Sequence, residues 1–257
     1  MNRAVIISIA LVFAILTLTS ASPRAASISA KQLIHNYDLI AFGNEYTGKR
    51  YDFVRKWAEP IRVGLQGKFP DYFEEYVADH IANLRKLTGH PIELYYSITL
   101  QKQKRLPKNF DPKKVNFILF YLPVEEIPAA VAKYFDNDQA AVKQMIKVST
   151  CFAKFGTRKN EIRWGIAVFP SHHPKEYMRA CVVEELTQVL GLPNDSTEVT
   201  NSIFNDKSRF FELTGQDKLM LKMLYDPRVT FGTPREKALE IGMDVLRGIA
   251  AQQRKAK

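Results

Sequence analysis

The sequence predicts an α+β domain with a mixed β-sheet, and three observations lead to this expectation. Short apolar runs typical of strands are interspersed with stretches in which apolar residues recur at helical spacing. Two of the apolar runs flank a short polar turn, as in a β-hairpin. The chain has 257 residues, of which 46% are hydrophobic and 11% aromatic, so it can bury a core and is not disordered as a whole. Strands and helices mixed in this order favour the α+β class.

Strands are predicted where apolar residues alternate with polar ones or form a short unbroken run. The run at 115–122 is continuously apolar and is expected to be buried. Pro60 interrupts an alternating pattern early in the domain, and the turn at 156–160 joins the two strands of the hairpin. These patterns place strands at 54–57, 61–65, 92–98, 115–122, 148–155 and 161–169.

Helices are predicted where apolar residues recur every three or four positions. Phe73, Val77 and Ile81 show this spacing, and Gly89 is expected to stop their helix. A later helix has a proline at its first turn, and Gly191 follows its end. These patterns place helices at 28–42, 71–87, 124–135, 139–146, 174–190, 214–225 and 236–251.

The first 21 residues have the order of a secretory signal peptide. Arg3 gives a positive start, residues 4–20 form an apolar run without a charge, and small residues surround Ala21, after which cleavage is expected. The apolar run is slightly short for a bilayer span, so an uncleaved N-terminal anchor is the alternative and the only route to a membrane that we expect. We therefore expect an exported protein, periplasmic or secreted.

Positive charge dominates the chain: 37 Lys and Arg residues against 27 Asp and Glu give a net charge of +10. An exported basic protein can meet anionic polymers, lipid headgroups or acidic partners in the cell envelope. The densest basic stretch, 102–114, is interpreted as a solvated loop, with docking to anionic polymers through Lys102, Lys104 and Arg105 as the alternative. No recognised nucleic-acid-binding motif accompanies the charge, so we do not expect a nucleic-acid partner.

The chain contains two cysteines, Cys151 and Cys181. An even number of cysteines in an exported chain favours one disulfide. The alternative, a catalytic thiol, is disfavoured because no obvious histidine base accompanies either residue in the sequence. We predict a disulfide between them.

The stretch most informative about chemistry is 184–195, which reads EELTQVLGLPND. It resembles the active-site helix of matrixin-type metzincin proteases, whose pattern is HExxHxxGxxH. In this comparison Glu185 takes the place of the general-base glutamate, and Gly191 takes that of the glycine that ends the helix. The resemblance implies a zincin-like fold, in which a mixed sheet carries the active-site-type helix and further helices follow at the C-terminus.

The three zinc-ligand histidines of that pattern are replaced by Glu184, Gln188 and Asn194. Glu184 and Gln188 share one helix face because they are four residues apart, and a turn after the helix can bring Asn194 or Asp195 back toward them. In a working zincin, zinc lowers the pKa of a bound water to ~7 and the glutamate takes its proton. The oxygen ligands here suit Ca²⁺, Mg²⁺ or Mn²⁺ better than zinc, and three of them form a weak site.

Two other interpretations of this helix stay open. Residues 184–188 can be the solvated edge of an amphipathic helix that binds no metal. Zinc held by ligands from elsewhere would depend on His172 and His173, which are adjacent and so generally point in different directions. We expect no cofactor, with a divalent metal as the alternative.

Further motifs follow the helix. Residues 201–204 resemble the Met-turn of the metzincins, with phenylalanine in place of methionine. Taken with the helix, the sequences SIFND and LYDPR resemble motifs of an uncharacterised exported bacterial family, domain of unknown function 2927, which is placed near the zincin peptidases. This resemblance implies a fold and no particular activity. The motif residues beyond the helix are Ser202, Phe204, Asn205, Asp206, Asp226 and Arg228.

These observations predict four segments: a signal peptide or anchor at 1–21, a helical leader at 22–52, a zincin-like domain at 53–231, and a C-terminal helix with a basic tail at 232–257. The first functional hypothesis is an envelope binding module without peptidase chemistry. Its old substrate cleft would take a peptide or protein partner as an added strand. The alternative is an atypical metal-dependent hydrolase that uses Glu185 as general base and holds its metal through oxygen ligands.

Overall fold

The computed structural model describes residues 28–45, 47–205, 207 and 210–255. Its strands are β1 (Lys56–Trp57), β2 (Ile61–Gly67), β3 (Ile92–Tyr96), β4 (Phe117–Leu122), β5 (Phe152–Arg158) and β6 (Glu161–Pro170). Its α-helices are α1 (Ala30–Phe42), α2 (Asp71–Thr88), α3 (Ile98–Lys102), α4 (Ile127–Val131), α5 (Gln139–Val148), α6 (Lys175–Gln188), α7 (Gly215–Leu224) and α8 (Arg235–Lys255). Two short 3₁₀ turns are η1 (Pro112–Lys114) and η2 (Ala132–Tyr134).

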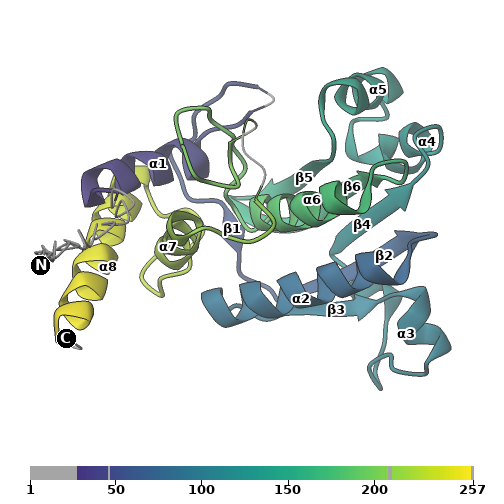
Figure 1. Ribbon diagram of the computed structural model, residues 1–257, viewed down its shortest axis with the longest axis horizontal. Helices are drawn as coiled ribbons and strands as arrows, with labels where there is room; N and C mark the ends of the chain where they lie inside the picture. Colours follow the sequence, from purple (N-terminus) through teal and green to yellow (C-terminus); the bar gives the residue numbers. More distant parts are fainter. Residues whose placement is uncertain (1–27, 46, 206, 208–209, 256–257) are drawn as a thin grey trace, which may run out of the picture.

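The strands form one mixed sheet, as predicted, with the C-terminal helices beside it (Figure 1). Strands β3, β2, β4 and β6 lie in that order and run parallel, and the short β1 runs parallel to the start of β6. Strand β5 pairs antiparallel with β6 through a hairpin whose turn residues, Lys159 and Asn160, both have positive φ. The fold is nearer to α/β than the predicted α+β class, because parallel neighbours require crossover connections such as α2.

Two apolar cores lie on opposite faces of the sheet. Successive residues of a strand point to opposite faces. Leu119 and Tyr121 of β4 therefore enter the large core beneath α2 and α6, whereas Ile118 and Phe120 enter a smaller core with α4 and α5. The large core continues without a break into α1, α7 and α8.

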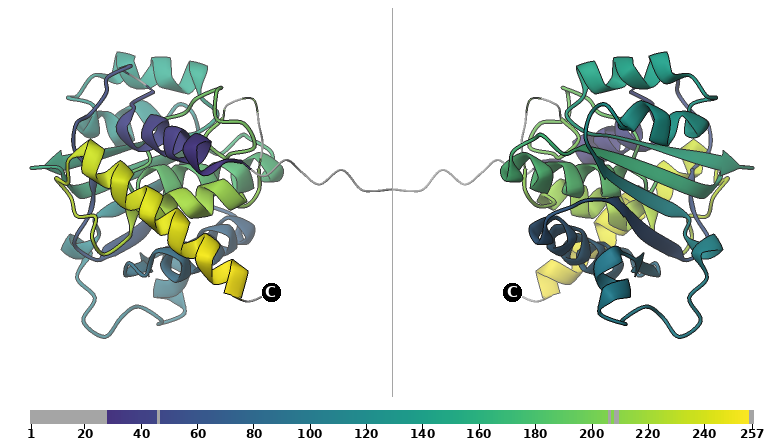
Figure 2. Two further views of the ribbon diagram at one scale, coloured as in Figure 1. Left: turned by 90° about the vertical axis from the view of Figure 1, so that its left-hand side faces the viewer. Right: turned by 90° about the vertical axis from the view of Figure 1, so that its right-hand side faces the viewer.

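Helices α1 and α8, from the two ends of the described chain, lie side by side (Figures 1 and 2). Asp38 of α1 accepts hydrogen bonds from the Arg235 guanidinium at 2.5 and 2.6 Å and from Arg50 at 2.7 Å. Burial alone would raise the pKa of Asp38, but the two arginines outweigh it and lower that pKa. The leader and the C-terminal helix are thus joined by an ion-paired contact and share one core with the sheet.

The structure differs from the predicted elements mainly at their ends. The strand predicted from 148 begins at Phe152, because α5 continues to Val148. Ile98, predicted at the end of a strand, instead begins α3, where the Ser97 side chain accepts a hydrogen bond from the Leu100 amide and caps the helix. In both cases a residue predicted to lie in a strand belongs to a helix, because periodicity alone does not fix where a helix begins or ends.

The predicted disulfide is present. Cys151 and Cys181 are bonded with Cα atoms 5.9 Å apart, which ties the chain just before β5 to the middle of α6. The signal peptide or anchor predicted at 1–21 lies outside the described residues. Among the helices that are described, none combines the length and the apolar character needed to cross a bilayer.

Candidate functional site

A hollow of about 420 Å³, here called the acidic hollow, lies beside one face of α6 and the loop that follows this helix. Glu184, Glu185 and Gln188 reach it from α6, and Asp195 from the loop that follows. The leader contributes Glu45, which the sequence analysis did not single out. The disulfide and residues 148–150 form part of the wall.

Glu185 lines this hollow and is buried, with 4% of its surface exposed. Its Oε2 has no hydrogen-bond partner among the described residues. Burial raises the pKa of Glu185 well above its ordinary value near 4.5, and the negative charges of Glu184 and Glu45 raise it further. The carboxyl group therefore holds its proton into the pH range where an exposed glutamate is ionised.

Gln188 connects the helix to the following loop. It is 4% exposed, and its Nε2 donates to Asp195 Oδ1 at 3.0 Å. Asn194, at the third ligand position of the zincin pattern, does not line the acidic hollow. Its Nδ2 donates instead to the Leu39 carbonyl of α1 at 3.0 Å. The structure thus brings Glu184, Glu185, Gln188 and Asp195 together and turns Asn194 toward the leader.

Gly191 explains the path of this loop. Its φ of +113° is a conformation that residues with a side chain rarely adopt, and a Cβ there would lie 2.2 Å from the Arg55 carbonyl oxygen. Only glycine allows the chain after α6 to pass this close to the backbone of Arg55, just before β1. The sharp turn then directs Asn194 to α1 and Asp195 to Gln188.

The donors do not fit a zinc site. Amide and carboxylate oxygens are poor substitutes for three imidazoles. Among the described residues no group of three or more His, Cys, Asp or Glu is arranged to hold a metal ion. The rings of His172 and His173 contact each other at a tilt of 40°, with centroids 3.9 Å apart, and neither lines the acidic hollow. We therefore derive no step through a bound metal.

A second hollow of about 400 Å³, here called the apolar hollow, lies along β5 and meets the acidic hollow at Gln188. Ala153, Lys154 and Phe155 all line it. Because successive side chains of a strand point to opposite faces, this hollow borders the edge of β5 and not one face of it. Met145 of α5 adds to its apolar wall.

Arg55 holds the leader loop over the apolar hollow, and sequence reasoning missed this role. It is 5% exposed, donates to the Ala41 and Gly43 carbonyls, and lies 3.5 Å above the centre of the Tyr51 ring. Burial lowers the pKa of Arg55 to about 10, so it keeps its charge at neutral pH. Arg55 and Lys56 between Val54 and Trp57, two adjacent basic residues within a predicted strand, were the available signal.

The motif residues after α6 build the loop that supports this region. Ser202 Oγ donates to Asp217 Oδ1 of α7 at 2.6 Å, and the Phe204 amide donates to Ser202 Oγ at 3.1 Å. Phe204 is buried, and Asn205 Nδ2 donates to the Val199 carbonyl at 3.1 Å. These residues hold the turn together and do not line either hollow.

Asp226 and Arg228 pair with each other at the turn between α7 and α8. Arg228 Nε donates to Asp226 Oδ1 at 2.8 Å, and neither residue lines the two hollows. Hydrogen bonds from Arg228 lower the pKa of Asp226, although partial burial opposes this. The remaining motif residue, Asp206, lies outside the described residues.

Residues 30–242 match the model of a family described as a protein of unknown function, DUF2927. The chain belongs to the DUF2927 family. The match runs from the start of α1 into α8, so the DUF2927 region includes the leader helix as well as the sheet. Comparison with curated proteins and with solved structures gave no match.

Proposed function

We propose that this protein is a peptide-binding module of the cell envelope, with a zincin-like arrangement of elements and no peptidase chemistry. The observation that carries the proposal is the edge strand β5. It pairs with β6 on one side only, and no hydrogen bond from the described residues reaches its outer edge. An extended peptide can pair with such an edge through main-chain hydrogen bonds while its side chains enter neighbouring pockets.

The zincin-like part of the proposal has support in the topology. An antiparallel edge strand, a parallel strand and then a long helix carrying EELTQ follow one another along the chain. Of the polar residues of this helix, Gln188 reaches the hollow along β5, whereas Glu184 and Glu185 line the adjoining acidic hollow. This arrangement agrees with the resemblance of residues 184–195 to the metzincin pattern.

The absence of peptidase chemistry is supported by the state of Glu185. A general base must be deprotonated at the working pH, and burial and two neighbouring acids shift the pKa of this carboxyl group upward, in favour of the protonated form. The turn of Asn194 toward α1 removes one of the proposed ligands from the hollow. A binding role needs neither a base nor a metal.

Location in the envelope is proposed from the N-terminal sequence and the disulfide. Disulfides persist mainly in oxidising compartments outside the cytoplasm. The bond between Cys151 and Cys181 agrees with export directed by residues 1–21.

The test is selection of peptides from a phage-displayed random library on the purified protein. Selected peptides are then synthesised with single N-methyl groups, which remove one main-chain donor at a time. We expect binding to be lost at every second position, because alternate amides of an added strand face β5. Phe155→Ala should weaken binding, and Glu185→Gln should leave it unchanged. Tolerance of N-methylation at every position would refute binding by strand addition.

The hydrolase alternative has one observation in its favour: two adjacent carboxyl groups, Glu184 and Glu185, share a hollow and one has a raised pKa. Paired carboxyls with different pKa values can serve as acid and base. In this state Glu185 would donate a proton, contrary to the general-base role expected from the sequence. Cleavage of a quenched fluorogenic peptide library that Glu185→Gln abolishes, with folding unchanged, would favour this alternative.

A further inference from the structure

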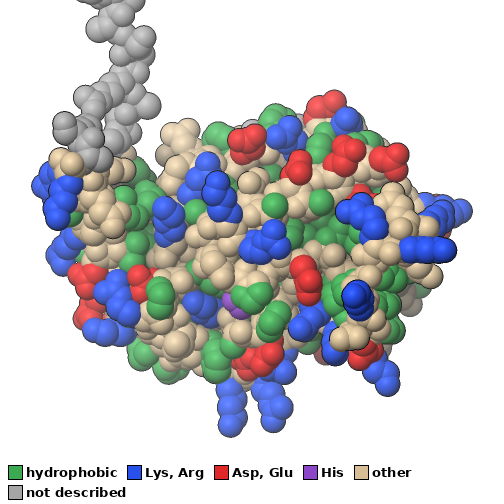
Figure 3. Space-filling view, turned by 90° about the horizontal axis from the view of Figure 1, so that it is seen from below, with side chains coloured by type: hydrophobic (Ala, Val, Ile, Leu, Met, Phe, Trp, Pro, Cys, Tyr) green, Lys and Arg blue, Asp and Glu red, His purple; other side chains and the backbone are tan. Residues whose placement is uncertain are grey.

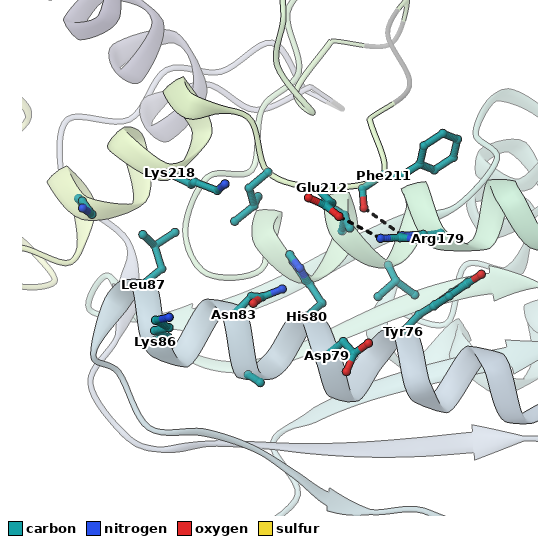
Figure 4. A pocket seen from close by; sticks show the side chains of 15 residues that line it. Tyr76, Asp79, His80, Asn83, Lys86, Leu87, Arg179, Phe211, Glu212 and Lys218 are labelled. Carbon is teal, nitrogen blue, oxygen red and sulfur yellow. Dashed lines mark hydrogen bonds and ion pairs between the residues drawn. The ribbon is translucent and has the colours of Figure 1, made fainter.

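The largest of the described hollows lies on the other side of α6. It measures about 690 Å³ and lies between α2, α6 and α7, and we call it the basic groove (Figure 4). Helix α6 contributes Arg179, Val182 and Val183 to it, whereas Cys181, Glu184 and Gln188 face the acidic hollow. At 100° per residue these two sets lie on opposite faces of the helix. The basic groove is therefore separate from the cleft beside β5.

Positive charge is concentrated at one end of this groove. Lys86 of α2 and Lys218 and Lys222 of α7 line it, and no hydrogen bond or ion pair joins the ammonium group of any of the three to a described residue. Figure 4 shows Lys86 and Lys218 together with Asn83 at this end, and Asp79 further along α2 toward Tyr76. Three ammonium groups without a carboxylate partner leave an uncompensated positive field.

The other end of the groove is closed by a neutral pair. Arg179 donates to Glu212 at 3.1 Å and to the Phe211 carbonyl at 3.3 Å, and Figure 4 shows both bonds across the rim. His80, on the floor, contributes no charge: burial lowers its pKa to about 4, and its Nε2 is hydrogen-bonded to Thr187 Oγ1 at 3.0 Å. With Arg179 and Glu212 paired, the three lysines are opposed only by Asp79, which leaves the groove with a net charge of +2.

The floor between these ends is apolar. Val182, Val183 and Leu213 are at most 7% exposed, and Leu87 lies beside them. Residues 76–87 of α2 line one wall, and at about 1.5 Å of rise per residue this wall is about 16 Å long. An extended peptide of about five residues has that length, because each residue of a strand spans about 3.3 Å.

We propose that the basic groove binds an acidic, partly apolar peptide segment of a partner protein. Carboxylates of the segment would lie at Lys86, Lys218 and Lys222, and its apolar side chains would contact the floor. The groove is concave, which a flat membrane surface does not fit. In the view of Figure 3, Lys and Arg side chains are scattered among acidic ones over the face seen from below. This second site is independent of the proposed strand addition at β5.

The test uses fluorescence anisotropy with a labelled hexapeptide of alternating glutamate and leucine. We expect Lys86→Glu combined with Lys218→Glu to weaken binding about tenfold or more, since two of the three positive charges at this end are reversed. The matched control is Lys113→Glu combined with Lys114→Glu, which makes the same change of net charge at the exposed turn η1. The control should change the dissociation constant by less than about twofold, and circular dichroism should show both variants folded.

Two further measurements separate peptide recognition from general attraction of anions. A peptide of alternating glutamate and serine carries the same charge without the apolar side chains, and it should bind several-fold more weakly. Inorganic phosphate should compete poorly. Equal loss of binding in the two pairs of variants would overturn the proposal, and so would equal binding of the two peptides, competition by phosphate at the peptide's own concentration, or no binding by the unmodified protein.

Discussion

Glu185 gives the sharpest prediction about stability. The folded protein holds a proton on Glu185 at pH values where the unfolded chain has released it, because its pKa is raised by burial and by Glu184 and Glu45. The unfolded state then binds fewer protons than the folded state, so the free energy of unfolding falls as pH rises. The stabilisation that comes from holding this proton is fully present below about pH 4.5 and is lost as the pH rises toward the pKa of Glu185 in the folded protein.

The size of the effect follows from the difference of one bound proton between the folded and the unfolded state. Within that window the free energy of unfolding falls by about 1.4 kcal/mol for each pH unit. Glu185→Gln removes the ionisation while keeping the shape of the side chain. The variant should match the unmodified protein near pH 4 and become more stable by up to about 1.4 kcal/mol for each unit above pH 5, until the folded pKa is reached.

The measurement is urea unfolding at a series of pH values, followed by tryptophan fluorescence, since Trp57 is buried in the large core. Glu75→Gln, on the exposed side of α2, is the matched control and should give a small difference that does not grow with pH. A constant difference between Glu185→Gln and the unmodified protein from pH 5 to 8 would refute the reasoning. Glu185 would then be ionised when buried, and a bound cation would have to compensate it.

Three other predictions concern the loop and the disulfide. Replacing Cys151 and Cys181 together by alanine should lower the free energy of unfolding by about 3.6 kcal/mol, the loop-entropy value for a separation of 30 residues, measured by urea unfolding. Gly191→Ala should cost at least about 2 kcal/mol, because it adds strain at positive φ and a contact with backbone; an unchanged melting temperature would contradict this. Asn194→Ala should cost about 1 kcal/mol through the lost bond to Leu39 and should speed hydrogen exchange in α1, whereas unchanged exchange would show that this bond does not hold the leader.

Local sequence signals predicted much of the fold. The mixed sheet, the disulfide and the long helices were found because periodicity, cysteine number and helix-ending glycines are local or compositional signals. The start of β5 was missed because residues 148–151 have strand-like side chains. In the structure Val148 ends α5 and Cys151 forms the disulfide with Cys181 before β5 begins. The sequence pattern could not show where tertiary contacts would end α5 and begin β5.

The candidate site shows the same limit. Helical spacing correctly placed Glu184 and Gln188 on one face, but both Asn194 and Asp195 were open candidates to join them. The choice depends on the Leu39 carbonyl of α1, which is far away in the sequence. The basic groove was not foreseen at all, since its lysines come from helices more than a hundred residues apart and form no local motif.

The pairing of α1 with α8 has a consequence for synthesis. Chains emerge from the ribosome N-terminus first, so α1 is made long before its partner helix. Until Arg235 appears, Asp38 lacks the guanidinium that holds it at 2.5 Å in the finished fold, and the apolar face of α1 has no α8 to cover it. The native domain therefore closes only after α8 has been made. A chain cut short before α8 should be recognised as incomplete by proteases, because the face of α1 that packs against α8 remains exposed.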